Sequence, residues 1–186
     1  MSNTNLDWLI SVDDHILEPP TLWTDRVATK DRDRAPHVET VDGREVWVYD
    51  GKRMPTSGLS AVAGKRKEEF SPEPVTYAEM RPGCYDPVER LADMDRAGIL
   101  ASLCFPSVPR FCGQLFHEGS DREFGFQCLQ IYNDWMIDEW CSGEAHGRLI
   151  PLTVVPLWDP KLAAEEVRRC AAKGSHAIAF SENPSK

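Results

Sequence analysis

One local pattern occurs twice in this chain and constrains the fold more than any other feature. An Asp-Pro pair opens a stretch with apolar residues at helical spacing, a glycine closes it, and a compact apolar run follows. The first copy covers residues 86–105 and the second covers residues 159–180. Asp is favoured at a helix N-cap, Pro at the first helical position and Gly at the left-handed C-terminal cap, and a short apolar run is typical of a strand buried on both faces. The pattern therefore predicts two copies of a helix followed by a buried strand.

Three further segments extend this alternation. Residues 9–13 and 149–155 are β-prone runs, and the capping box formed by Ser120 and Glu123 predicts a long helix through Trp140. Strands that alternate with helices form a parallel α/β sheet, either open and doubly wound or closed as a barrel. The first strand-to-helix junction has no glycine-rich turn of the kind that binds dinucleotides. This counts against the open sheet, although an open domain that binds a small ligand at its strand ends remains an alternative.

Residues 26–85 have a different character, rich in charge, proline and glycine. Asp42-Gly43 predicts a tight turn between residues 39–41 and 44–49, which gives a β-hairpin. Residues 51–83 show little apolar periodicity, and their charged run at 65–69 predicts a solvated loop. We interpret residues 26–85 as an arm inserted into a single domain that covers residues 1–186.

Length and composition restrict the possibilities further. The 186 residues are 41% hydrophobic, which is enough for a sizeable core, but a complete (β/α)8 barrel needs roughly 250 residues. Only about the first four strands of such a barrel are therefore expected. The net charge of −9 excludes a broad basic surface for nucleic acid or anionic membranes. The sequence shows no signal peptide and no long apolar span, which favours a cytoplasmic protein. Its six cysteines occur singly, which favours reduced thiols.

The end of the first strand carries the clearest candidate for chemistry. Asp13 and His15 are two residues apart, so on a strand their side chains project from the same face. A carboxylate and an imidazole side by side at the carboxyl end of a barrel strand form a partial site for Zn²⁺ or Mn²⁺. On spacing alone, the alternative is that His15 makes a loop hydrogen bond while Asp13 caps a turn.

Residues 11–23, with the sequence SVDDHILEPPTLW, resemble the opening of amidohydrolase-related proteins in the amidohydrolase superfamily. This group includes aminocarboxymuconate-semialdehyde decarboxylase and hydroxybenzoate decarboxylases. Residues 87–99, 150–152 and 179–184 also resemble it. The resemblance implies a metal-dependent (β/α)8 TIM-barrel fold, of which this chain is the amino-terminal half.

The resemblance also implies roles for particular residues. Many relatives have His-x-His at the end of the first strand, and this chain has Asp13 in place of the first histidine. Asp13 and His15 therefore carry over as metal ligands. The other ligands and the general acid/base belong to later strands that the chain does not contain, so its catalytic residues are unknown.

Three more residues are candidates for contact with the metal or substrate. Glu18 would approach the metal or orient a metal-binding imidazole, or it is a loop carboxylate beside Pro19-Pro20. His117 would reach the mouth of the barrel from the loop after the second barrel strand, or faces solvent. Glu182 follows the last strand, where it contacts substrate or is an ordinary polar loop residue. His176 lies at the opposite end of that strand and is expected to be structural.

These features predict part of a metal-dependent enzyme that hydrolyses, or decarboxylates without oxidation, a small carboxylated substrate. The alternative is a catalytically inactive half-barrel that pairs with itself or with a separate second half, because a cut sheet has exposed strand edges. In either case we expect a homo-oligomer that binds neither nucleic acid nor a membrane.

Overall fold

A four-stranded parallel sheet forms the centre of the computed structural model, which describes residues 9–56, 58–73, 75–110 and 112–180. The strand order is β1-β5-β6-β7, and each neighbouring pair is parallel, as the alternation of helices and strands predicts. The strands are β1 (Leu9–His15), β5 (Ile99–Phe105), β6 (Leu149–Val154) and β7 (Ala177–Ala179).

Both copies of the repeated pattern form a helix with the predicted Asp N-cap, but the C-cap of the second helix is Lys173 and not the predicted Gly174. Asp86 accepts hydrogen bonds from the amides of the first turn of its helix, and Asp159 does the same in the second copy. Gly98 ends the first helix in the left-handed region, with φ of 69°. The helices of the sheet layer are α1 (Pro87–Ala97), α2 (Gln114–His117), α3 (Arg122–Trp135) and α4 (Pro160–Ala172).

The predicted N-cap of α3 is wrong by one residue. Asp121, not Ser120, caps the helix by accepting a hydrogen bond from the amide of Phe124. Ser120 is instead bound to the carboxylate of Asp50 through both its amide and its hydroxyl group. A contact with a residue far away in the sequence has therefore replaced the local capping box.

The long helix through Trp140 continues beyond α3 as a π-helical turn, η6 (Met136–Trp140). Tyr132, Trp135 and Trp140 are all buried in the main hydrophobic cluster. Their burial indicates that this aromatic series serves packing rather than substrate binding. A 3-10 turn, η7 (Gly143–Ala145), then leads to β6.

A second, antiparallel sheet is built from residues within 26–85. Strands β2 (His37–Val41) and β3 (Arg44–Tyr49) form the predicted hairpin around Asp42-Gly43. A third strand, β4 (Lys52–Pro55), pairs with β3 and was not predicted. Short 3-10 helices precede and follow these strands along the chain: η1 (Thr29–Arg34), η2 (Gly58–Ala61), η3 (Lys67–Glu69), η4 (Tyr77–Glu79) and η5 (Pro82–Cys84).

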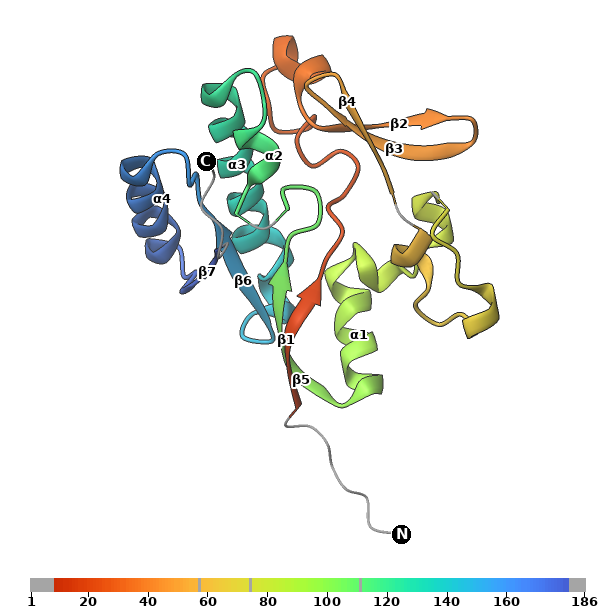
Figure 1. The fold of residues 1–186 in the computed structure, drawn as a ribbon. Coiled ribbons are helices and arrows are strands. Elements are labelled where there is room, and N and C mark those ends of the chain that lie inside the picture. The colour runs from red at the N-terminus through yellow and green to blue at the C-terminus, as the bar shows by residue number, and fades with distance from the viewer. Residues whose placement is uncertain (1–8, 57, 74, 111, 181–186) are drawn as a thin grey trace.

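This antiparallel sheet and the segment after it share the core of the parallel sheet. Trp47, Val75, Tyr77 and Met80 are buried in the same hydrophobic cluster as the residues of α3. Val75, Tyr77 and Met80 therefore belong to the core although the sequence around them shows little apolar periodicity, and the charged run at 65–69 is exposed as predicted. Figure 1 shows the antiparallel sheet near the carboxyl ends of β1 and β5.

All six cysteines are free, and five of them are buried, as expected for reduced thiols. In the described part of the chain, no helix has both the length and the apolar character needed to cross a membrane.

Candidate functional site

Asp13 and His15 lie side by side at the carboxyl end of β1. The Oδ1 atom of Asp13 is 3.7 Å from Nε2 of His15, and the two side chains are 82% and 46% exposed. The imidazole ring also stacks on Phe105, its neighbour on β5, with ring centroids 5.6 Å apart. The spacing of the two residues correctly predicted that they share a face, whereas their role as metal ligands stays a prediction.

An irregularity in β1 accompanies this pair. Four residues of β1, from Ser11 to Asp14, lie opposite three residues of β5, from Ser102 to Cys104. Such a bulge changes the direction of neighbouring side chains and is frequent near active sites. It lies at Val12 and Asp13 and was not foreseen from the sequence.

Asp14, between the two candidate ligands, has a different environment. It accepts a hydrogen bond from the hydroxyl group of Ser102 and forms an ion pair with Arg90 of α1, at 3.0 Å. Arg90 also donates to the carbonyl oxygen of His15 at 3.0 Å. Arg90 and Asp14 therefore fix the end of β1 from the helix side, and no feature of the sequence indicated this.

Glu18 is fully buried and binds the loop between β5 and α2. Its two carboxylate oxygens accept hydrogen bonds from the amides of Ser107, at 3.1 Å, and Val108, at 3.0 Å. Burial raises the pKa of Glu18 to about 7, although these backbone hydrogen bonds favour the charged form. The observed contacts are those of a carboxylate that positions a loop, and a role of Glu18 beside a metal or substrate stays a prediction.

His117 is the last residue of α2, and it packs against a residue of another strand-end loop. Its ring stacks on Trp158, which lies between β6 and α4, with centroids 5.7 Å apart and planes 22° apart. Its Nδ1 atom is buried and has no hydrogen-bond partner within the described residues. His117 is therefore partly exposed, and its contact with a substrate stays a prediction. Glu182 lies outside the described residues.

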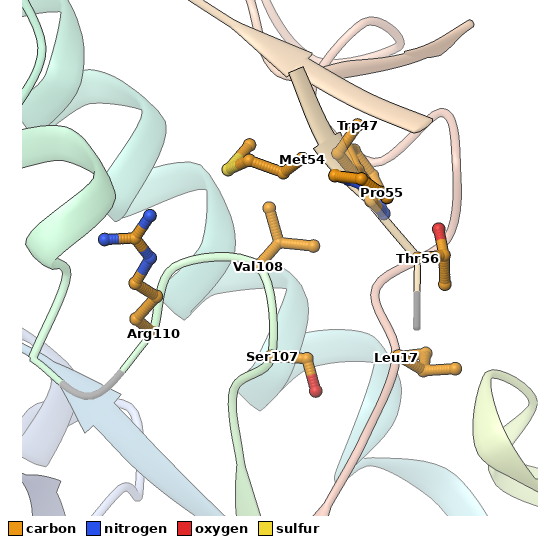
Figure 2. A pocket seen from close by; sticks show the side chains of 8 residues that line it. All are labelled: Leu17, Trp47, Met54, Pro55, Thr56, Ser107, Val108 and Arg110. Atoms are coloured by element: carbon orange, nitrogen blue, oxygen red, sulfur yellow. The ribbon is translucent and has the colours of Figure 1, made fainter. Parts of the chain in front are cut away.

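A pocket of about 220 Å³ opens between the antiparallel sheet and the carboxyl ends of β1 and β5 (Figure 2). It is lined by Leu17, Trp47, Met54, Pro55, Thr56, Ser107, Val108 and Arg110. None of these residues was singled out from the sequence, because the pocket joins segments that are far apart along the chain.

The family model for amidohydrolases matches residues 21–186. The chain belongs to the amidohydrolase family. The matched region begins after Asp13 and His15, so the match does not test the candidate ligands. No curated protein matches the chain.

The structure is similar to the crystal structure of an amidohydrolase from Mycobacterium avium subsp. paratuberculosis K-10. The TM-score is 0.66 and the identity 22%, and the alignment covers 92% of this chain and 48% of the other. The chain thus spans about half the length of this solved relative. The parallel sheet of this amidohydrolase chain fits part of a TIM barrel.

The described residues of this amidohydrolase chain provide an incomplete set of metal donors. A carboxylate oxygen and an imidazole nitrogen are both ligand types that Zn²⁺ and Mn²⁺ accept. Among the described residues, however, no three His, Cys, Asp or Glu side chains are grouped to hold an ion. Asp13 and His15 therefore fit two positions of a metal site, and a catalytic site normally needs more.

Proposed function

We propose that this chain is the amino-terminal part of a metal-dependent enzyme of the aminocarboxymuconate-semialdehyde decarboxylase-like group of amidohydrolases. The observation that carries the proposal is the placement of Asp13 beside His15 at the carboxyl end of a parallel strand. In TIM barrels this end of the strands carries the active site. Residues 1–186 then form one part of a single barrel domain, and residues 26–85 are its inserted arm.

Within this proposal, Asp13 and His15 hold a Zn²⁺ or Mn²⁺ ion. The chemistry that such an ion supplies is Lewis-acid polarisation of a water or of a substrate oxygen. This chemistry suits hydrolysis or non-oxidative decarboxylation of a small carboxylated substrate. His117 and Glu182 are proposed to face the substrate, and Glu18 to keep the neighbouring loop in place.

Replacement of His15 by alanine is expected to weaken binding of Zn²⁺ by at least about tenfold, because it removes one of only two protein donors. Asp13→Ala is expected to have a similar effect. Isothermal titration of the chain with Zn²⁺ measures both. His176→Ala is a matched control, since it removes an exposed imidazole just before β7, at the opposite end of the strands. Equal affinities for all four proteins would rule out Asp13 and His15 as the metal site.

The exposed edge of the sheet favours a second proposal, an inactive half-barrel that associates with a second copy. Strand β1 lies at one end of the strand order, and its residues Leu9, Ile10 and Val12 are exposed. Unpaired strand edges with apolar side chains promote association.

Sedimentation velocity over a range of concentrations is expected to show self-association of the chain. Val12→Lys should shift the chain towards the monomer, because it places a charge on the exposed edge of β1, where Val12 is 67% exposed. The control is Val88→Lys, which changes a similarly exposed valine on α1. A monomer at every concentration would contradict this second proposal and the expected homo-oligomer.

A further inference from the structure

We propose that the pocket between the antiparallel sheet and the β5–α2 loop binds a small apolar molecule that carries a carboxylate, and that Arg110 binds this carboxylate. The identification of this molecule as the substrate rests on the proposed function. Its binding does not, because no residue of the pocket is a candidate metal ligand.

The walls of the pocket suit an apolar body. Leu17 comes from the segment after β1, Trp47 and Met54 from the antiparallel sheet, and Val108 from the loop after β5. The volume of about 220 Å³ is below the roughly 300–1,000 Å³ of pockets for drug-sized ligands. A ligand of about one ring is therefore the appropriate size.

Arg110 supplies the positive charge of the pocket. Figure 2 shows its guanidinium group at one end of the group of lining residues, away from Thr56 and Leu17. Its Nη1 atom donates to both oxygens of Glu118, at 3.2 and 3.3 Å. Within the described part of the chain, its Nη2 and Nε atoms have no hydrogen-bond partner. A guanidinium held at one nitrogen, with two other donors unused, is suited to a ligand carboxylate.

The other polar groups that line the pocket already have partners. The hydroxyl group of Thr56 donates to the carbonyl oxygen of Glu45 at 3.2 Å. The hydroxyl group of Ser107 donates to the carbonyl oxygen of Ile16 at 2.6 Å, and its amide donates to Glu18. Arg110 is therefore the group that can distinguish a carboxylate from a neutral ligand of the same shape.

The backbone of Arg110 provides an independent argument. Its φ angle is +59°, in the left-handed region that long side chains rarely adopt. Glycine would adopt this conformation with less strain. Strained residues of this kind cluster at ligand-binding sites, where a side chain is held in place despite its backbone.

The test uses benzoate as the probe and benzamide as its neutral counterpart, with the metal-free chain in the presence of a chelator. Nuclear magnetic resonance would follow the amides of Ser107 and Val108 and the indole of Trp47 during each titration. We expect benzoate to bind at least about tenfold more tightly than benzamide, because charge-assisted hydrogen bonds to Arg110 form only with the carboxylate.

Three variants make the test specific. Arg110→Asn removes the charge but tolerates the left-handed backbone, and it should reduce benzoate affinity to that of benzamide. Arg110→Gly should lose the same affinity while raising Tm, because the backbone strain is relieved. Arg66→Asn is the control, since Arg66 is an exposed partner of Glu69 outside the pocket, and it should leave benzoate binding unchanged.

Three results would each overturn the inference. They are equal affinities for benzoate and benzamide, a lack of saturable benzoate binding, and undiminished benzoate binding by a folded Arg110→Asn variant. Because a chelator is present, the result is separate from the test of Asp13 and His15. Benzoate binding without Zn²⁺ binding would contradict the metal-dependent proposal alone, and the reverse result would contradict this inference alone.

Discussion

The free energy of unfolding is expected to fall by about 3 kcal/mol between pH 4.5 and pH 7 because of one residue, Glu18. Burial raises the pKa of Glu18 from 4.5 to about 7 in the folded chain. Within this window the folded state holds a proton that the unfolded state has lost. The contribution of Glu18 to the free energy of unfolding is therefore fully present below pH 4.5 and is lost as the pH rises through 7.

Urea unfolding of the native chain and of Glu18→Gln, from below pH 4.5 to above pH 7, measures this effect. The glutamine side chain does not titrate. The unfolding free energy of the native chain should therefore fall by about 3 kcal/mol relative to that of Glu18→Gln across the window. A difference that stays constant with pH would contradict the prediction.

Glu166 offers a matched control for Glu18. It is also buried, but Arg169, Asn133 and Gln130 bind it and hold its pKa at about 2 despite the opposing effect of burial. Its folded pKa is lowered, so its contribution is present above pH 4.5 and is lost only as the pH falls towards 2. Glu166→Gln should therefore leave the slope between pH 4.5 and 7 unchanged.

The ionisation of Glu18 also bears on the candidate binding site. Its carboxylate accepts hydrogen bonds from the amides of Ser107 and Val108, which both line the pocket. Arg110 follows in the same loop. The charged form of Glu18 can accept hydrogen bonds from both amides, but it is poorly solvated in its buried position. In the neutral form a proton occupies one carboxyl oxygen, which weakens that oxygen as an acceptor for its amide. Protonation of Glu18 would therefore change the hydrogen bonds that hold Ser107 and Val108 at the wall of the pocket.

The parts of the fold that the sequence predicted are those that local interactions determine. The caps at Asp86 and Asp159 and the helix end at Gly98 each depend on residues a few positions away, and all three were foreseen. The turn at Asp42-Gly43 is equally local, since both residues adopt positive φ angles. Local patterns of this kind can be read without knowing where the segment packs.

The parts that were missed depend on contacts between distant segments. Val75 and Tyr77 carry no helical or strand periodicity, and they are buried because they meet the antiparallel sheet and the parallel-sheet layer. The hydroxyl group of Tyr77 donates to the carbonyl oxygen of Glu18, 59 positions earlier. Strand β4 was missed because its residues are identified as a strand by their pairing with β3, and no local sequence pattern indicated that pairing.

The candidate site divides in the same way. The closeness of Asp13 and His15 agrees with a spacing of two residues on one strand, although the irregularity at Val12 and Asp13 was not foreseen. Arg110 was not found, because neither its φ angle nor its place in a pocket is encoded in a neighbouring motif. The loop-binding role of Glu18 depends on Ser107 and Val108, about ninety positions away.

Replacement of Trp23 by alanine is expected to lower the free energy of unfolding by about 4 kcal/mol, in the range of about 3–5 kcal/mol for buried aromatic residues. Trp23 is fully buried, and its indole nitrogen donates to the carbonyl oxygen of Cys128 on α3 at 2.8 Å. Its ring also meets Trp47 of β3 and Phe116 of α2 edge-on, with centroids 5.5 and 6.1 Å apart. One side chain therefore joins the antiparallel sheet to two helices of the other layer.

The variant Trp23→Phe separates packing from hydrogen bonding at this junction. It keeps an aromatic ring but loses the donor to Cys128, so we expect it to lose about half as much stability as the alanine variant. Urea unfolding measures both losses, and hydrogen exchange of the β3 amides shows where they act. Faster exchange in β3 without a global loss would mean that the antiparallel sheet opens independently. A shared loss in β3 and α3 would mean that the pocket between the two sheets is held by the same cooperative core as the barrel strands.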